Sequence, residues 1–351
     1  MAKGVRKSLV LTVTLCLTLL VVAVSADRTS AQVLPKISWD IPHYNSTGHF
    51  LILRLQEWGD EVKKRTNGNF TITVHPGESL MKGKQIAPAL LSGRVPLGPA
   101  QVGYADDIFV IHSITNLPFL TTSTEEIRHI AAREYRDYFA KLLDDMGLKM
   151  LMAFAHAPIQ AYTRSERMDT VDAWKGKKIR IFTSMMADLT LALKGVPMNI
   201  TYSEVYTALQ RATIDGYFTS NANLPFNKFY EVSKYVNMWG YSGGNMEYMC
   251  VNKEAFNKLP KEYQKALLEV IEDRKIEDKI WSDLIKNEEE SVDFLKTKGG
   301  MTILYPSKAE SGKIQEAALP IWDKWAKTYE NRGAKDVLEK IKNSIAAYRK
   351  R

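Results

Sequence analysis

Cysteine is nearly absent from this chain of 351 residues, which contains only Cys16 and Cys250. Cys16 lies in an apolar N-terminal segment without a lipobox-like context, so we do not expect a lipid anchor there. Once that segment is removed, Cys250 has no partner, and an intramolecular disulfide is excluded even in an oxidising compartment. Stability must therefore come from burial, and about 320 mature residues suit two α/β domains of ordinary size.

The common catalytic signatures are also missing. The sequence has no G-x-x-x-x-G-K-[ST] loop, no G-x-G-x-x-G loop and no H-E-x-x-H helix, and its six histidines never fall at helical metal-ligand spacing. Nothing in the pattern calls for a cofactor or a metal. One alternative stays open, in which Glu247 and Gln101 hold a cation beside a ligand.

One serine does fit a hydrolase pattern, in residues 240–244 (GYSGG). The G-x-S-x-G elbow requires a helix directly after the serine and a histidine later in the chain. Here residues 246–251 resemble a strand, and the last histidine is His156. A glycine-rich turn is therefore favoured, and a periplasmic serine hydrolase that uses Ser242 is a distant alternative.

The N-terminus is typical of an export signal. Lys3, Arg6 and Lys7 precede an apolar run over residues 9–24, and residues 24–26 (VSA) form a small-residue cleavage pattern. We expect residues 1–26 to be removed, with a second possible cut after Ala31, and the mature chain to be periplasmic. The run is short for a membrane span, although retention as an anchor is an alternative.

Loss of the signal lowers the formal charge from +8 to +5, because three basic residues are removed with it. The remaining charge is spread along the chain, which argues against a nucleic-acid partner. We expect no membrane insertion of the mature protein.

The stretch from residue 175 to residue 219 predicts a βαβαβ unit. Strands are expected over 177–182, over 197–202 and from 217 onward, with one helix that ends at Gly195 and another capped by Ser203. Ligands of such open sheets gather at the carboxyl ends of the strands, where Arg180 lies. A buried guanidinium needs a carboxylate, and the pattern alone favours an internal salt bridge over a ligand.

A long helix is expected from Pro260 to about Lys298, because no plausible break interrupts it. At about 1.5 Å per residue it would exceed about 50 Å, which is longer than one domain needs. It is either a coiled-coil-like arm or a spine that crosses both halves of a two-lobed protein.

A set of short segments recurs in one known family. The segments are residues 175–180 (KGKKIR), Gly195-x-Pro197, residues 203–210 (SEVYTALQ), Asp215-Gly216 and residues 228–232 (KFYEV). The set resembles the solute-binding subunit of TRAP transporters, the DctP family, and matches it without insertion from Arg180 to Glu231. Weaker likeness covers nearly the whole mature chain.

The resemblance implies an α/β, two-lobed periplasmic-binding-protein fold of type II-like architecture, with a long spine helix crossing both lobes. Lobe I would comprise residues 33–156 and 245–285, and lobe II residues 157–244 and 286–351 with the C-terminal helices. The protein would close on a small organic anion through hinges near residues 155–158 and 242–246. It would deliver the anion to the small and large membrane subunits of a TRAP permease, without catalysis. A ligand-sensing subunit of a signalling system is the alternative.

The resemblance also implies a binding site. In the family an arginine on the first strand of the second lobe grips the ligand carboxylate through a two-pronged pair, and Arg180 occupies that place, which reverses the preference for a salt bridge. The other positions carried over are Gln101, Tyr104, Tyr44 (or Asn45), His156, Phe182, Thr183, Tyr202, Thr219 and Asn245.

Two positions depart from the family pattern. Ile159 stands where many members have a second arginine, and Thr219 stands where the usual asparagine is expected. The loss of one cation and one amide disfavours a strongly polar, sialic-acid-like ligand. It favours a single acidic group on an apolar or aromatic body, with His156 as a second donor.

Overall fold

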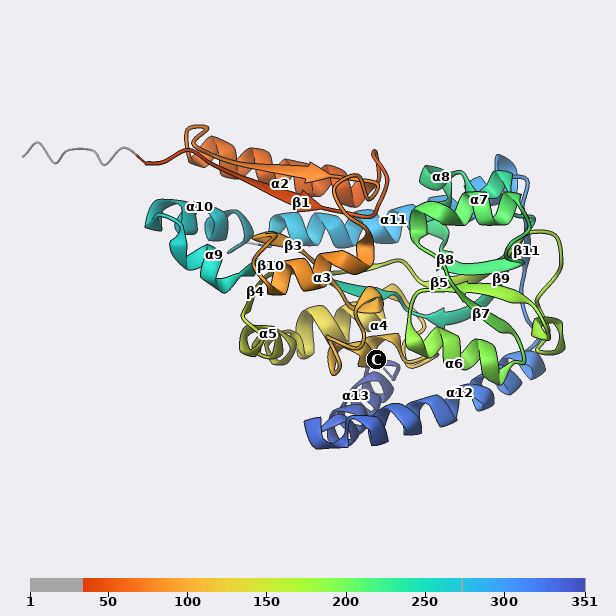
Figure 1. Ribbon diagram of the computed structural model, residues 1–351. Coiled ribbons are helices and arrows are strands. Elements are labelled where there is room, and N and C mark those ends of the chain that lie inside the picture. The colour runs from red at the N-terminus through yellow and green to blue at the C-terminus, as the bar shows by residue number, and fades with distance from the viewer. Residues whose placement is uncertain (1–33, 273, 351) are drawn as a thin grey trace, which may run out of the picture. The chain divides into compact units, whose positions relative to one another are not determined.

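The strands form three sheets within the described residues, 34–272 and 274–350, of a computed structural model. Residues 37–351 make up one compact unit. The strands are β1 (Ile37–Pro42), β2 (Phe70–His75), β3 (Leu97–Gln101), β4 (Leu148–His156), β5 (Ile159–Thr163), β6 (Lys178–Ile181), β7 (Val196–Asn199), β8 (Gly216–Ser220), β9 (Tyr235–Ser242), β10 (Asn245–Asn252) and β11 (Thr302–Leu304). Strands β1 and β2 pair in parallel, a second sheet has the order β3-β10-β4, and the third has the order β11-β9-β5-β8-β6-β7 (Figure 1).

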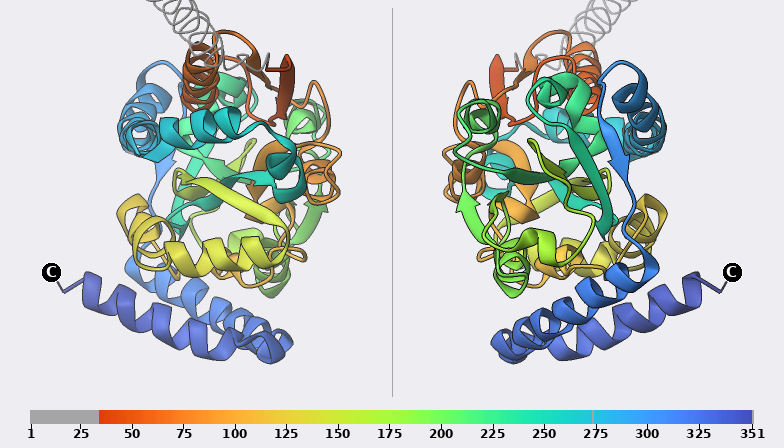
Figure 2. Two further views of the ribbon diagram at one scale, coloured as in Figure 1. Left: turned by 90° about the vertical axis from the view of Figure 1, so that its left-hand side faces the viewer. Right: turned by 90° about the vertical axis from the view of Figure 1, so that its right-hand side faces the viewer.

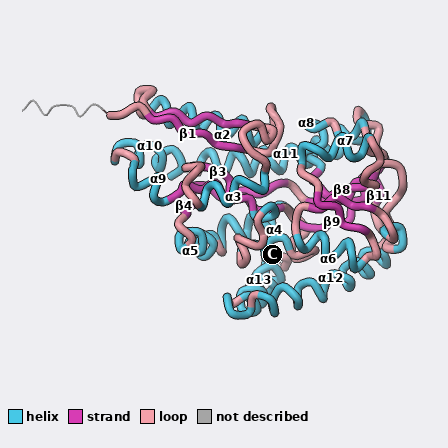
Figure 3. The backbone as a smooth tube through the Cα atoms, viewed as in Figure 1, coloured by secondary structure: helices cyan, strands magenta, loops and turns pink. Residues whose placement is uncertain are grey.

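Helices cover these sheets. Around the two smaller sheets lie α2 (Phe50–Arg65), α3 (Gly83–Leu91), α4 (Thr124–Ile127), α5 (Arg136–Asp145), α9 (Lys253–Lys258) and α10 (Lys261–Glu272), with the short helices η1 (Val102–Tyr104), η2 (His112–Asn116) and η3 (Arg128–Glu134). Around the six-stranded sheet lie α6 (Ser184–Ala192), α7 (Val205–Gln210) and α8 (Leu224–Asn227), with η5 (Tyr202–Glu204), η6 (Asn221–Asn223) and η7 (Phe229–Glu231). Figure 3 separates these helices from the strands they cover.

The chain crosses between the three-stranded and the six-stranded sheet twice, through residues 157–158 and 243–244. The crossings lie side by side, because His156 pairs with Asn245 and Ile159 pairs with Ser242. A Cβ at Gly244 would collide with the carbonyl oxygen of His156, so this glycine allows the two crossings to approach closely. The strand β10 follows Ser242 almost at once, as expected, and this geometry differs from that of a hydrolase elbow.

The predicted single helix over residues 260–298 is wrong in one respect. The chain breaks between α10 and α11 (Lys275–Thr297) at Arg274, which has a left-handed φ of 54°. Helix α11 nevertheless packs against α2 and β4 near its start and against η6, α8 and β11 further along. It therefore spans both sheet systems over about 35 Å, as a spine helix should (Figure 1).

The predicted βαβαβ unit is present, with β6 parallel to both β7 and β8. Its caps differ from the prediction. Lys194, not Gly195, takes the left-handed conformation after α6, with a φ of 61°. Ser203 lies within η5 and does not cap α7; its hydroxyl accepts a hydrogen bond from the Lys82 ammonium at 3.0 Å.

The last two helices pack on the outside of the earlier helices. Helix α12 (Lys308–Thr328) packs on α6, whereas α13 (Ala334–Tyr348) packs against η3 (Figure 2). Arg349 anchors this end through ion-paired hydrogen bonds of 2.8 and 2.9 Å to Glu126. Among the described residues, no helix is both long and apolar enough to cross a bilayer.

Candidate functional site

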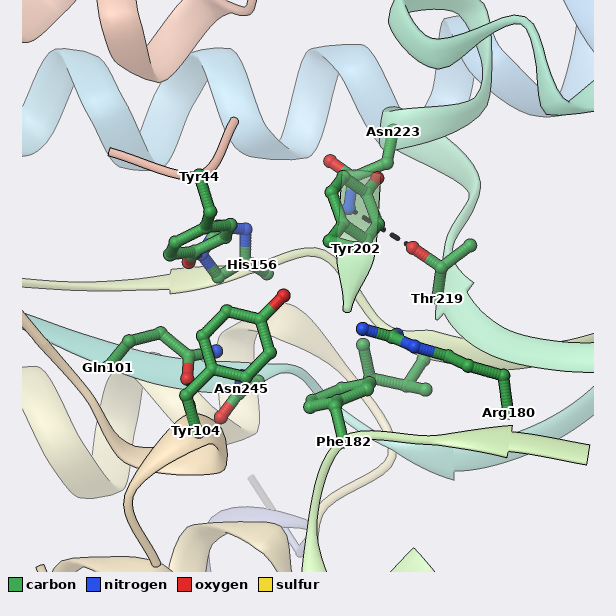
Figure 4. A pocket seen from close by; sticks show the side chains of 11 residues that line it. Tyr44, Gln101, Tyr104, His156, Arg180, Phe182, Tyr202, Thr219, Asn223 and Asn245 are labelled. Carbon is green, nitrogen blue, oxygen red and sulfur yellow. Dashed lines mark hydrogen bonds between the residues drawn. The ribbon is translucent and has the colours of Figure 1, made fainter. Parts of the chain in front are cut away.

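One small cavity lies between the three-stranded and the six-stranded sheet (Figure 4). Its volume is about 30 Å³. Every site residue expected from the sequence lines it, except Thr183. The residues that line it are Tyr44, Gln101, Tyr104, His156, Ile159, Arg180, Phe182, Tyr202, Thr219, Asn223 and Asn245.

Arg180 supplies the permanent positive charge of this cavity. Its side chain is only 2% exposed. Nε donates to the carbonyl of Ile200 at 3.1 Å, Nη1 donates to the carbonyl of Phe218 at 3.4 Å, and the guanidinium lies over the rings of Phe182 and Tyr202 at 5.1 and 5.6 Å. Across residues 34–272 and 274–350 it forms no ion pair with a carboxylate, so the internal salt bridge is wrong.

Tyr104 approaches the same guanidinium from the other side of the cavity (Figure 4). Burial raises the pKa of the Tyr104 hydroxyl, although a hydrogen bond with Arg180 and its charge lower it in part. The hydroxyl therefore keeps its proton at neutral pH. Gln101 fixes the backbone here, because its side-chain oxygen accepts the N–H of Tyr104 at 2.6 Å and its amide nitrogen is left to donate.

A buried carboxylate lies behind the opposite wall. Glu247, on β10, is 0% exposed. Its Oε1 accepts from His43 Nε2 at 3.0 Å, and its Oε2 accepts from His156 Nε2 at 3.1 Å and from the Tyr44 hydroxyl. Burial would raise the pKa of Glu247, but His43 and His156 lower it well below its ordinary value, so the group is a carboxylate. Burial and this carboxylate raise the pKa of Tyr44.

Asn223, four residues beyond Thr219, brings a side-chain amide to the cavity lining, where the sequence predicted the loss of one. Its Oδ1 accepts from His49 Nε2 at 3.0 Å, and its Nδ2 donates to the Thr219 hydroxyl at 3.2 Å. Burial lowers the pKa of His49 to about 3, so this imidazole is neutral. Asn223 was missed because it lies in η6, beyond the strand end at which the family position falls; the pair of asparagines at 221 and 223 was the available signal.

Ile159, which stands where many members of the family have a second arginine, lines the cavity. Thr183 differs from expectation. Thr183 does not line the cavity: its hydroxyl caps α6 by accepting the N–H of Met186 at 3.0 Å. Thr183 lines a neighbouring surface pocket instead, and it holds the helix that follows Arg180.

The alternative of a cation at Glu247 and Gln101 finds no support in the geometry. Both oxygens of Glu247 and the side-chain oxygen of Gln101 already accept hydrogen bonds from protein groups. Within the described part of the chain, no cluster of three or more His, Cys, Asp or Glu residues is arranged to hold a metal ion.

Ser242 is equally ill placed for hydrolysis. Its side chain is buried, and its hydroxyl donates to the carbonyl of Gly244 at 3.0 Å. A serine nucleophile needs a neighbouring base to take its proton. The hydrogen bonds of Ser242 include no such partner within the described residues, so the glycine-rich turn is the better interpretation.

The chain is similar in sequence to known proteins. An uncharacterised protein of Haemophilus influenzae is 26% identical over 316 residues, covering 89% of this chain and 93% of the relative. The C4-dicarboxylate-binding periplasmic protein DctP of Rhodobacter capsulatus is 28% identical over 59% of this chain and 62% of the relative.

Two solved structures illustrate the fold. A TRAP periplasmic solute-binding protein of H. influenzae with bound L-gulonate has a TM-score of 0.80 and 25% identity, covering 88% of this chain and 99% of that one. DctP7 of Bordetella pertussis, a receptor binding pyroglutamic acid, has a TM-score of 0.79 and 22% identity, covering 86% and 99%. The family model of the bacterial extracellular solute-binding proteins, family 7, matches residues 41–328. The chain therefore belongs to this family, DctP.

Proposed function

We propose that this protein captures a small organic acid anion in the periplasm and delivers it to a TRAP-type permease for secondary active uptake. The observation that carries the proposal is Arg180, a buried cation in a cavity between two sheets that forms no ion pair within the described chain. A guanidinium in that state is suited to a two-pronged bond with a carboxylate. The relatives with bound gulonate and pyroglutamic acid support this ligand class.

Capture proceeds by closure of the cleft. The acid pairs with Arg180 while the cleft is open, and the pair gains strength as closure removes water. Residues 155–158 and 242–246 act as hinges between lobe I (33–156 and 245–285) and lobe II (157–244 and 286–351). Better binding to the closed state shifts the population toward it. The closed form is then recognised by the small and large permease subunits.

The ligand body is apolar or aromatic. Ile159, Phe182 and the rings of Tyr44, Tyr104 and Tyr202 supply the apolar part of the cavity wall. Such rings bury a flat or aliphatic body well.

Residues 1–26 act as the cleaved export signal, so the mature receptor is free in the periplasm.

A thermal-shift screen of refolded mature protein against small organic acids tests the proposal. A ligand that binds only the folded state raises the melting temperature by mass action. We expect a shift for one class of carboxylates, its loss in Arg180→Met, and its retention in Arg211→Met, where an exposed arginine outside the cavity lining is removed. A shift that survives Arg180→Met would contradict the role of Arg180.

A further inference from the structure

Glu247 is the common hydrogen-bond acceptor of three side chains on its side of the cavity. The carboxylate accepts from His43, from His156 and from Tyr44, three donors that lie far from it in sequence. Tyr44 and His156 both line the cavity, whereas Glu247 and His43 lie behind them. A buried carboxylate is costly unless it is paired and hydrogen-bonded. Each of the three neighbours must therefore hold a proton on the atom that faces Glu247.

His43 is held in a neutral tautomer by the backbone. Its Nδ1 accepts the N–H of Asn45 at 3.1 Å, so the ring proton is on Nε2 and points to Glu247. A second proton on this ring would break the bond to Asn45. His43 therefore contributes a hydrogen bond but no full charge, and His156 is the imidazole that can balance the negative charge of Glu247.

This arrangement fixes the charge of the cavity. If Glu247 and His156 form a neutral pair, Arg180 is the one cation of the cavity lining left to a ligand. In Figure 4 Tyr44 and His156 lie on one side of the cavity and Arg180 on the other. A ligand that spans the cavity meets a positive pole at one end and a wall backed by a carboxylate at the other.

We propose that Glu247 determines specificity by neutralising His156, so that the cavity accepts ligands with one negative charge whose end remote from Arg180 is uncharged. The inference rests on the proposed receptor function and refines its ligand class to monoanions. A second carboxylate at the remote end would find His156 already paired and would lie near the charge of Glu247, which disfavours it. Glu247 acts through His156 and Tyr44 and is a positioning residue.

Pairs of acids that differ in one charge but not in shape test this inference. Suitable pairs are succinate with succinamate, glutarate with glutaramate, and terephthalate with 4-carbamoylbenzoate, measured by isothermal titration calorimetry on refolded protein. We expect the wild type to bind the monoamide of its preferred skeleton at least about tenfold more tightly than the diacid. In Glu247→Gln this ratio should fall at least about fivefold or reverse, because the negative charge behind the wall is gone.

Two further variants separate a specificity role from a structural one. His156→Gln leaves Glu247 without its counter-charge, so the preference for the monoamide should increase, opposite to Glu247→Gln. Tyr248→Phe removes a buried hydroxyl from the neighbouring position on β10, outside the cavity lining, and should leave the ratio unchanged. A structural defect would lower the affinity for both members of a pair, whereas the proposal requires their ratio to change.

The outcomes also distinguish the two proposals. Equal binding of amide and diacid by the wild type would overturn the role of Glu247 but leave an organic acid receptor intact. A ratio unaltered in both Glu247→Gln and His156→Gln would do the same. Failure of amides, diacids and all other carboxylates of the screen to bind would contradict the receptor function itself.

Discussion

The two buried charges around the cavity differ in how the protein treats them. Glu247 is 0% exposed and is satisfied by two imidazoles and a phenol. Arg180 is 2% exposed, and its partners among the described residues are carbonyl groups, ring faces and the Tyr104 hydroxyl. Both ions lost water on folding, but within the described residues only Glu247 received imidazole groups as partners. A buried charge that side chains of the protein already satisfy maintains the fold, whereas one without a carboxylate partner, such as Arg180, is available to a ligand.

The largest expected effect is on stability. Glu247→Ala leaves His43, His156 and Tyr44 without their acceptor and should lower the free energy of unfolding by about 3–5 kcal/mol. Arg180→Met replaces an uncompensated cation by an apolar side chain of similar length and should change it by less than about 1 kcal/mol. Urea denaturation of refolded, ligand-free protein measures both. Equal losses of unfolding free energy in the two variants would contradict the distinction between Glu247 and Arg180.

A second acid, the half-buried Glu288, extends the contrast to the dependence of stability on pH. Glu288 on α11 accepts from Asn221 at 2.6 Å, and burial raises the pKa of Glu288 to about 7. Because this folded-state pKa lies above the ordinary value of 4.5, the folded protein holds the proton more tightly, and stability falls as pH rises from 4.5 to about 7. The contribution is on the order of 2 kcal/mol or less, because the side chain is partly exposed.

Glu288→Gln should remove this slope. The difference in melting temperature between variant and wild type should grow as pH rises from 5 to about 8. Taking a difference matters, because His49, with its pKa lowered to about 3, contributes the opposite trend: its stabilisation is lost as pH falls from 6.5. A difference that is constant with pH would mean that Glu288 titrates normally.

A smaller effect is expected at the hydroxyl shared with Arg180. Tyr104→Phe removes one hydrogen-bonding group beside the guanidinium but keeps the ring that packs on Phe182 at 6.0 Å. Affinity for the organic acid should fall about five- to tenfold, which corresponds to the loss of one ordinary hydrogen bond of about 1 kcal/mol. Titration calorimetry with Tyr248→Phe as the matched control checks this, and an unchanged affinity would show that Tyr104 serves only by packing.

The smallest effect concerns the rim of the cleft. Asp106, just after η1, accepts both the N–H and the hydroxyl of Ser184 at 2.7 Å, at the start of α6, and Lys84 donates to Asn199 at 2.6 Å nearby. These contacts join the two sides without using the ligand. Asp106→Asn should raise the dissociation rate about threefold by weakening a charge-assisted bond. Stopped-flow fluorescence should show no such change in Asp107→Asn, its exposed neighbour.

The sequence supports the strand-and-helix order and the position of Arg180, because alternation, glycine stops and the family motifs are all local. It does not reveal the partners of Glu247, since His43 lies 204 positions away and a network of that kind exists only after folding. The break at Arg274 was missed because no glycine or proline marks it. Thr183 was expected in the cavity lining because it follows the strand of Arg180. Its hydroxyl caps the next helix instead, a role that the sequence did not distinguish from ligand binding.

The side-by-side crossings have a mechanical consequence. A rotation moves each atom in proportion to its distance from the axis, and Ile159, His156 and Asn245 flank the crossings while also lining the cavity. Arg180 lies two strands away from β5, at about 10 Å. In the proposed closure, the residues beside the crossings would therefore move least, and the guanidinium of Arg180 would move farther. A ligand whose acid group is already paired with Arg180 would therefore travel with lobe II, and its body would approach the residues beside the crossings as the cleft closes.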